Sequence, residues 1–462
     1  MKNNRPNILI IYTDQQRWDT IRYAGNPNII TPNLDDLASR GVLFKNAFSN
    51  APVCMPSRMS MLSGQYPSTL GVCCNGIEMP EHIPTLATIL GQYGYSTANI
   101  GKLHFKNHSN RDHREPYPSY GFDTLIISEE PGCYDDAYIK WVELQNPSAV
   151  DSCRSDTPPE WTGKPIRKNP RNTHEPYIFE GPENLTHSCF VASEIEIFLR
   201  SHENLHKPFF AIAGFYAPHT PLNPPKRFVE LYNPDNLPLP IMNKDENKLE
   251  LTDIQWQKIK AYYYALITHV DEEIGKILRV LDETKQRNNT IVIFTSDHGE
   301  HLGDHGAIQK GPPGYDSCIH VPLIISIPEN QNNGSITNEL VEAVDIAPTI
   351  LDMCSVQIPP FFQGISLVKI IRGEKHKQRK STFMESRIPF GKSWKTIRTK
   401  DFKLCISNSA EELLFDLKKD PNELQNRAKV KNYQNVLMDM RKELLSRWFK
   451  IEKQYPLKTG QY

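Results

Sequence analysis

The chain has 462 residues, too many for one small core, and its length suits a large domain with a smaller one beside it. Apolar residues make up 39% and charged residues 23%, as in ordinary soluble globular proteins. Lysine plus arginine (53) nearly balance aspartate plus glutamate (54), so no global field draws the protein to nucleic acid or to an anionic membrane. An anionic ligand therefore needs a local cluster of cations.

The N-terminal segment and the cysteines predict a cytoplasmic protein. The apolar run at residues 8–12 is too short for the core of a signal peptide, and Asp14 follows it closely. No stretch approaches the ~18–20 apolar residues that span a bilayer. The nine cysteines are odd in number, scattered and without zinc-type spacing, which agrees with a reducing compartment. No pattern indicates an oligomeric state.

Buried-strand patterns alternate with helical patterns along most of the chain. The strand patterns cover residues 7–13, 96–100, 209–215, 291–296 and 321–327. The clearest helix begins at Thr252, a good N-cap, and its apolar positions recur at steps of three or four from Trp256 to Leu281. This alternation predicts an α/β fold in which helices sandwich a large, mostly parallel sheet.

The composition changes after about Gly364. A basic stretch at 375–380 precedes short strand patterns at 381–385, 395–399 and 402–406 and an amphipathic helix near 433–449. We expect a catalytic domain over residues 1–364 and a C-terminal α+β subdomain over 365–462, with a small antiparallel sheet and a terminal helix. The Pro-rich stretch 151–182 predicts a long loop, and such loops in compact enzymes often border the active site.

Two pairs of polar residues follow predicted strands. Asp14 and Gln15 come after the first strand, and Asp297 and His298 come after strand 291–296. Because ligands of α/β sheets gather at the carboxyl ends of strands, the two pairs can converge. Two carboxylates with an amide oxygen suit Ca²⁺ or Mg²⁺, and an imidazole also admits Mn²⁺. Either pair alone is more often a turn or a helix cap; together they predict one divalent metal, for which Ca²⁺ is the first choice.

A cysteine motif stands before a predicted short helix near Pro56. A lone cysteine is often a buried hydrophobe, but Cys54 is followed by Pro56 and Arg58 at fixed offsets. This spacing resembles the signature of type I sulfatases of the alkaline phosphatase superfamily; Gln65 departs from it, since the signature usually has Arg there. The resemblance implies that a formylglycine-generating maturase oxidises Cys54 to 3-oxoalanine, whose hydrate attacks sulfur. The free N–H groups of the helix N-terminus would seat a sulfuryl group.

The resemblance covers most of the chain and extends to other functional positions. At the family's metal-ligand positions stand Asp14, Gln15, Asp297 and His298. At positions that hold the nucleophile or contact sulfate stand Arg58, Lys102, His104, His219 and Lys310. The resemblance implies that His219, with Lys310, protonates the departing alcohol and that His104 deprotonates the second hydroxyl. Taken singly, such residues are commonly turn or loop residues, as we expect for His301 and His305. The prediction therefore depends on all these residue types occurring together in the order that the family has.

The substrate implied by the resemblance is a sulfated carbohydrate. Residues 25–27 and 52–58 look closest to bacterial uronate 2-O-sulfatases acting on glycosaminoglycan fragments. The alternatives are a phosphonate monoester or phosphodiester hydrolase, or a choline sulfatase, with the same nucleophile and metal site, and a catalytically silent binder of sulfated glycans. The pair Lys102 and His104 favours sulfate. We expect subsite residues in the loop 151–182 and at Arg387, Lys392 or Arg398.

Overall fold

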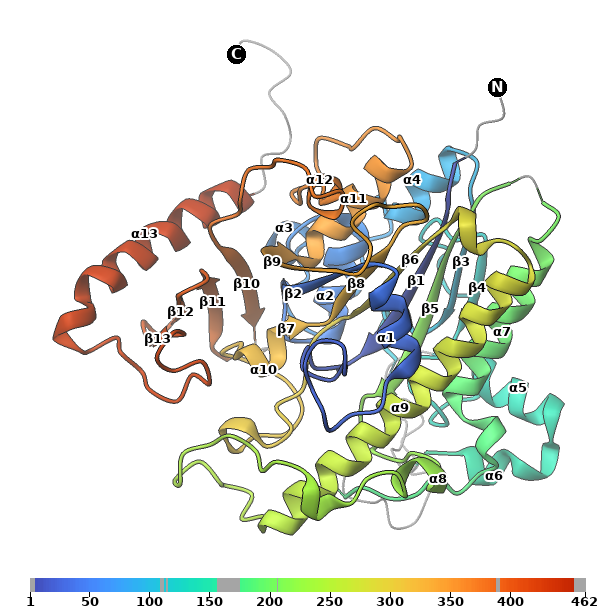
Figure 1. The fold of residues 1–462 in the computed structure, drawn as a ribbon, viewed down its shortest axis with the longest axis horizontal. Coiled ribbons are helices and arrows are strands. Elements are labelled where there is room, and N and C mark those ends of the chain that lie inside the picture. Colours follow the sequence, from blue (N-terminus) through green and yellow to red (C-terminus); the bar gives the residue numbers. More distant parts are fainter. Residues whose placement is uncertain are drawn as a thin grey trace.

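A mixed sheet forms the centre of the computed structural model, which describes residues 5–108, 112–113, 115–155, 175–205, 207–387 and 391–452 (Figure 1). Among these residues the sheet has nine strands in the order β4-β3-β5-β1-β6-β8-β2-β7, with β9 beside β2. The strands are β1 (Asn7–Asp14), β2 (Val42–Phe48), β3 (Ser96–Gly101), β4 (Thr124–Ile127), β5 (Phe209–Pro218), β6 (Thr290–Ser296), β7 (His320–Val321), β8 (Leu323–Ser326) and β9 (Ser335–Glu342).

The half of the sheet around β1 is parallel. Strand β1 lies between β5 and β6, and β5 continues through β3 to β4, all in the same direction. On the other side β8 runs antiparallel to both β6 and β2. The predicted strand at 321–327 is divided at Pro322, which has no N–H to give to a ladder, into β7 and β8. The predicted α/β architecture is confirmed.

Helices cover both faces of the sheet. The α-helices before the C-terminal sheet are α1 (Pro32–Ser39), α2 (Cys54–Ser63), α3 (Pro67–Leu70), α4 (Leu86–Gln92), α5 (Ala137–Gln145), α6 (Val150–Cys153), α7 (His187–Ser201), α8 (Lys226–Val229), α9 (Asp253–Glu283), α10 (Asp316–Ile319), α11 (Ile346–Met353) and α12 (Val368–Ile371). Side chains alternate across a strand, so Leu9 and Ile11 of β1 pack with α7 and α9. Ile8 and Ile10 face α2, α4 and α11. Both faces are buried, which is why β1 is a continuous apolar run.

Helix α9 confirms the strongest helix prediction. It begins at Asp253, directly after the predicted cap Thr252, whose backbone N–H donates to the side chain of Gln255 at 2.8 Å. Such a capping box satisfies N–H groups that the helix itself leaves unpaired. None of the helices in the described ranges is both long and apolar enough to cross a membrane.

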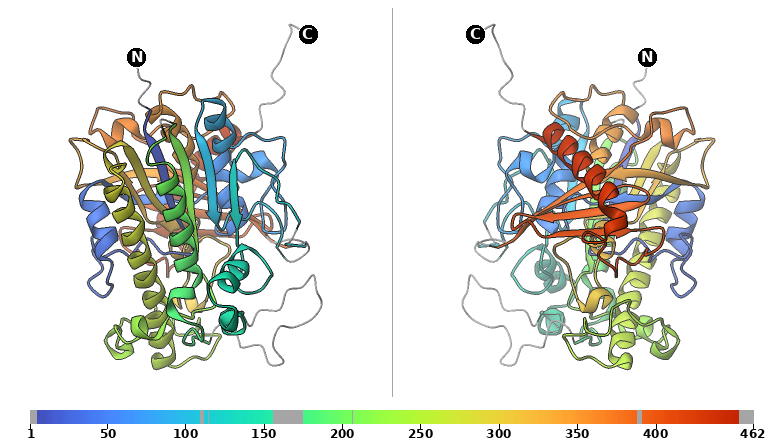
Figure 2. Two further views of the ribbon diagram at one scale, coloured as in Figure 1. Left: turned by 90° about the vertical axis from the view of Figure 1, so that its right-hand side faces the viewer. Right: turned by 90° about the vertical axis from the view of Figure 1, so that its left-hand side faces the viewer.

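The C-terminal part folds on a second, antiparallel sheet (Figure 2). Its four strands and its helix are β10 (Thr382–Arg387), β11 (Ser393–Arg398), β12 (Phe402–Ser407), β13 (Glu412–Asp416) and α13 (Gln434–Ile451). Leu437, Met440 and Leu444 of α13 are buried with apolar residues of these strands. The subdomain sheet and its terminal helix were predicted, whereas β13 was not. The boundary at residues 364 and 365 stays a prediction.

Candidate active site and metal centre

The strand ends bring the two predicted acidic residues together. β1 pairs in parallel with β6, with Thr13 opposite Ser296, so Asp14 and Asp297 leave adjacent strands at the same edge. The backbone N–H of Gln15 donates to Asp297 Oδ1 at 3.0 Å. Both carboxylates are fully buried. The convergence expected from the strand pattern is therefore present.

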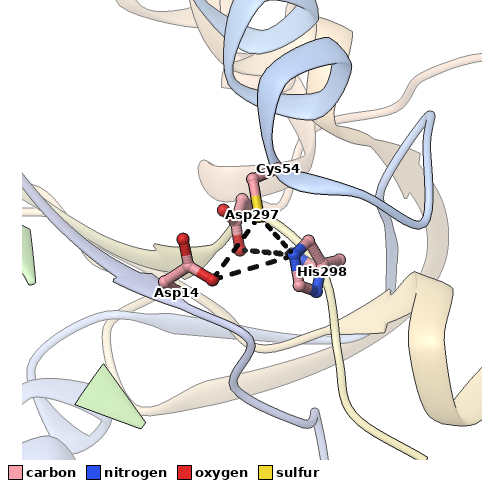
Figure 3. A group of neighbouring side chains, drawn as sticks. All are labelled: Asp14, Cys54, Asp297 and His298. Carbon is pink, nitrogen blue, oxygen red and sulfur yellow. Dashed lines mark hydrogen bonds and ion pairs between the residues drawn. The ribbon is translucent and has the colours of Figure 1, made fainter. Parts of the chain in front are cut away.

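Helix α2 brings Cys54 to the same point. The helix begins at Cys54 itself, two residues before the predicted start, and the thiol lies at its N-terminus. Cys54 Sγ is 3.2 Å from His298 Nε2 and 3.8 Å from Asp14 Oδ1. Figure 3 shows these side chains and Asp297 pointing towards one another.

Arg58, one turn further along α2, holds the two carboxylates in place. Its Nε donates to Asp297 Oδ2 at 2.7 Å, and its Nη2 lies 3.2 Å from Asp14 Oδ2. A third nitrogen, Nη1, donates to the carbonyl oxygen of Lys102 at 3.0 Å. Arg58 is itself buried, and a buried guanidinium with these partners fixes the direction of both carboxylates.

The remaining donor atoms fit a divalent cation. Arg58 binds the Oδ2 atoms of Asp14 and Asp297, and the two Oδ1 atoms each lie 3.7 Å from His298 Nε2. Asp297 Oδ1 also accepts from the N–H groups of Gln15 and His298. His298 Nδ1 faces the carbonyl oxygen of Gly299 at 2.8 Å and donates its proton there, which leaves Nε2 as an acceptor. Atoms of Asp14, Asp297, His298 and Cys54 all lie within 4.8 Å of one another. This donor set suits a hard or borderline cation.

Gln15 lies at the edge of this cluster. Its side-chain oxygen accepts from Lys310 Nζ at 2.9 Å, and its amide nitrogen donates to the buried carboxylate of Glu300. These contacts orient the amide oxygen towards the pocket between Cys54 and Lys310. Its role as a metal ligand stays a prediction.

Two lysines place positive charge around the thiol. Lys310 Nζ is 3.1 Å from Cys54 Sγ, and Lys102 Nζ forms a buried ion pair with Asp14 Oδ2 at 2.8 Å. Burial and then the charge of Asp14 oppose ionisation of the thiol, but nearby positive charge, led by Lys310 and Lys102, outweighs them and lowers the pKa of Cys54. The site is therefore built to stabilise negative charge at position 54.

His219 and Lys310 form a hydrogen-bonded pair. His219 Nδ1 faces the carbonyl oxygen of Thr220 at 2.7 Å and must donate to it, so Nε2 is the acceptor for Lys310 Nζ at 2.5 Å. Burial, followed by the charge of Lys310, holds the pKa of His219 well below its usual range. In this arrangement the transferable proton is on Lys310.

His104 is buried and held by its backbone. It has a φ of 60°, and its N–H donates to the Glu129 carboxylate at 2.6 Å. Its Nε2 lies 3.2 Å from His108 Nδ1, and its Nδ1 is buried without a hydrogen-bond partner among the described residues. Burial, and then the charge of Lys102, keeps the pKa of His104 well below its usual range. The imidazole is therefore neutral and one ring nitrogen remains unpaired.

The structure gives His301, His305 and Arg398 contacts away from the thiol. His301 Nδ1 lies 3.1 Å from Ser317 Oγ, and His305 stacks on the ring of Tyr315 at 3.7 Å. Arg398 pairs with Asp316 at 3.0 Å. Because this ion pair occupies the guanidinium of Arg398, the structure does not support the prediction that Arg398 binds substrate.

The two described ends of the predicted loop 151–182 reach a cavity beside His219. Arg154 and Phe179, which flank the undescribed residues 156–174, line a small cavity together with His219. The centre of the predicted loop 151–182 thus lies outside the described residues, while its two ends reach the candidate site. Lys392 pairs with Glu411 at 2.5 Å.

Sequence reasoning missed Glu129 and Glu300, which orient the candidate residues. Glu129 is fully buried and accepts from His104 N and from the hydroxyl of Tyr117 at 3.0 Å. Glu300 accepts from Gln15. Both follow strands, β4 and β6, so position after a strand end was the available indication. Nothing in the local spacing separates them from surface acids.

Gly214→Ala is expected to displace Lys102. A Cβ at position 214 would lie 2.4 Å from the carbonyl oxygen of Lys102 and 2.8 Å from its nitrogen, so backbone must move. Overpacking of this kind costs about 1–3 kcal/mol of unfolding free energy. Turnover should also fall, because the same carbonyl accepts from Arg58. Denaturant unfolding and a turnover assay measure the two effects.

Gly91→Ala is the matched control. At position 91 the nearest atom to a new Cβ is 3.9 Å away, so the methyl group meets no clash. Unchanged stability is expected, or a slight gain from helix propensity in α4. Equal losses in the two variants would contradict a specific contact between Gly214 and Lys102.

Comparison with known proteins gives consistent matches over the whole chain. The model of a family described as Sulfatase matches residues 6–356, and that of N-sulphoglucosamine sulphohydrolase, C-terminal, matches residues 303–449. An arylsulfatase of Clostridium perfringens is 32% identical over 487 residues, covering 96% of this chain and 94% of the relative. An ulvan-active sulfatase of Formosa agariphila is 29% identical, covering 94% and 80%. The solved phosphonate monoester hydrolase of Agrobacterium radiobacter has a TM-score of 0.84 at 25% identity, covering 97% of both chains.

Proposed function

Because the chain belongs to the sulfatase family and is a sulfuric ester hydrolase, we propose that it hydrolyses a sulfate ester of a carbohydrate through a formylglycine hydrate made from Cys54. The observation that carries this proposal is the place of Cys54. It stands at the N-terminus of α2, 3.2 Å from His298 Nε2 and 3.1 Å from Lys310 Nζ. A separate maturase, which supplies the oxidant, would convert the thiol-bearing carbon to an aldehyde with loss of the sulfur as sulfide, and water would add to the aldehyde.

The thiol sulfur marks where the hydroxyl oxygens of the hydrate would lie. One deprotonated hydroxyl attacks the ester sulfur, and the bond from sulfur to the sugar oxygen breaks. The second hydroxyl then loses its proton, the bond from the Cβ of residue 54 to sulfate oxygen breaks, and the aldehyde returns. A serine could perform the first step and not the second, since it has no second hydroxyl.

Arg58, Lys102 and Lys310 prepare the pocket for this charge. Arg58 fixes the positions of both carboxylates. Lys310 Nζ lies 3.1 Å from Cys54 Sγ, and Lys102 Nζ lies 2.8 Å from Asp14 Oδ2 beside it. Fixed charges in a buried pocket stabilise a developing anion without reorganising at the moment of reaction. A cation held by Asp14, Gln15, Asp297 and His298 would add further positive charge here, and Ca²⁺ is the metal that we assign.

The contacts assign the two proton transfers to different residues: one to Lys310 with His219, and the other to His104. Lys310 donates a hydrogen bond to His219, so Lys310 is the group that can give a proton to the departing alcohol, with His219 orienting it. His104 offers an unpaired Nδ1 as base for the second hydroxyl. Its other nitrogen faces His108, which lies 3.6 Å from the Glu130 carboxylate and leads towards solvent.

The substrate that we propose is a uronate 2-O-sulfate in a glycosaminoglycan-derived fragment. Support comes from the local sequence around Cys54 and from relatives named as an ulvan-active sulfatase and an iduronate 2-sulfatase. The cysteine pattern favours a location in the cytoplasm, and a small imported fragment could reach an enzyme there.

A phosphonate monoester hydrolase is the second candidate. The similarity to the Agrobacterium radiobacter enzyme extends over 97% of both chains at 25% identity. Sulfuryl and phosphoryl groups are both tetrahedral and anionic, so the same cations could receive either. The relatives named as sulfatases favour sulfate.

One set of assays tests the proposal. Matured protein should release sulfate from an aryl sulfate faster than it cleaves an aryl phosphonate monoester. Among sulfated disaccharides that differ only in sulfate position, the uronate 2-O-sulfate should be hydrolysed fastest. Mass spectrometry of the peptide with Cys54 should show oxygen in place of sulfur. Full activity with an intact thiol would refute the mechanism.

A further inference from the structure

A second cluster of metal-ligating side chains lies between α7 and α9, which run side by side (Figure 1). It consists of Cys189 from α7 with His269 and Glu273 from α9. The last two are four residues apart, so they project from the same face of the helix. The three side chains are almost completely buried. None of them belongs to the site described above.

The three donor atoms have the spacing of a coordination site. Cys189 Sγ is 3.4 Å from Glu273 Oε1 and 3.8 Å from His269 Nε2, and the latter two atoms are 3.9 Å apart. Ligands of tetrahedral zinc, at about 2.0 Å for nitrogen or oxygen and 2.3 Å for sulfur, lie about 3.3–3.6 Å from one another. Shifts of a few tenths of an ångström would therefore centre an ion.

The protonation state of His269 suits a metal, whereas that of Cys189 must change when a metal binds. Burial lowers the pKa of His269 to about 3, so the imidazole is neutral and can coordinate through Nε2. Burial, reinforced by Glu273, raises the pKa of Cys189 to about 12, so the thiol keeps its proton until a metal displaces it. Lys276 now pairs with Glu273 at 2.6 Å, but its side chain is 43% exposed and can turn to solvent.

An entry path reaches the cluster. A pocket of about 240 Å³ is lined by Cys189, Glu273 and Lys276 together with Trp141 and Asn184. An ion can arrive through it, and a water molecule in it can complete the coordination. Thr186 Oγ1, 3.4 Å from His269 Nε2, is a further oxygen at the same place.

We propose that Cys189, His269 and Glu273 form a second metal site, selective for Zn²⁺, that fastens α7 to α9. A thiolate, an imidazole and a carboxylate together suit a borderline ion such as Zn²⁺. The site at Asp14 has two carboxylates instead and suits a harder ion. Thiolate and Glu273 would together neutralise the ion. The competing explanation is a metal-free hydrogen bond from the Cys189 thiol to the Glu273 carboxylate.

Cobalt substitution separates the two explanations. The experiment uses full-length Cys54→Ala protein, in which the thiol of the first site is gone, after chelator dialysis and titration with Co²⁺. The proposal predicts a near-ultraviolet thiolate-to-cobalt band that saturates at one ion per chain and is displaced by Zn²⁺. Zn²⁺ should also raise the thermal unfolding midpoint. Absence of the band overturns the proposal.

Two further variants identify the ligands in the same background. Cys189→Ala should remove the band, whereas Cys354→Ala, a buried cysteine elsewhere, should keep it. Glu273→Gln keeps a hydrogen-bonding group of the same shape, and should weaken Co²⁺ binding by at least about 100-fold. A band that survives in Cys189→Ala, or unchanged affinity in Glu273→Gln, would overturn the assignment. Because the readout is metal binding in an inactive variant, it is independent of the sulfatase proposal.

Discussion

Cys54→Ala is expected to lower sulfate release by a factor on the order of 10⁶, as loss of a catalytic nucleophile does elsewhere. The methyl group of alanine cannot be converted to the aldehyde hydrate. Cys54 Sγ lies 3.1 Å from Lys310 Nζ and 3.2 Å from His298 Nε2. Steady-state sulfate release from an aryl sulfate measures the loss, and circular dichroism checks that the fold is retained.

Cys54→Ser is the informative companion. A serine hydroxyl can accept the sulfuryl group, but it lacks the second hydroxyl whose deprotonation expels sulfate. We expect at most one turnover, with the sulfuryl group retained on residue 54 and visible as added mass in the intact protein. Continued turnover in Cys54→Ser, or full activity in Cys54→Ala, would show that residue 54 is not the nucleophile.

Lys102→Ala is expected to reduce turnover by about 10²–10³, or about 3–4 kcal/mol of transition-state stabilisation. Lys102 is fully buried, and its Nζ pairs with Asp14 Oδ2 at 2.8 Å. The nearby carboxylate and thiol raise its pKa despite burial, so it stays charged across the working pH range. The loss should appear in kcat, because this charge acts on the anion that forms during the reaction.

Lys106→Ala, in the same loop, controls for this prediction. Lys106 is partly exposed and pairs with Glu78 at 3.4 Å, a contact that contributes little. Its kinetics should match those of the wild type. If Lys102→Ala also behaved like the wild type, Lys102 would be only a turn residue, which was its alternative interpretation from sequence.

The strand ends show how far local patterns predict a site. Residues 7–13 and 291–296 are apolar runs, and parallel strands end at a common edge, so the convergence of Asp14 with Asp297 followed from pattern and sheet geometry. The family resemblance added Arg58 and the lysines. The division of one predicted strand at Pro322 and the strands β2, β4, β9 and β13 were not anticipated, because strands depend on their neighbours as much as on their own residues.

By itself, the sequence determined the buried strands β1, β3, β5 and β6 and the long helix α9, because hydrophobic periodicity is a local property. It also determined that a short helix lies near Pro56, although the structure starts that helix at Cys54. Only the tertiary structure decided which nitrogen of His219 accepts a hydrogen bond, that Glu129 holds His104, and that Cys189 meets Glu273. These contacts join residues 25 to 91 positions apart. Their distances are set by how helices and strands pack, and no local spacing encodes that packing.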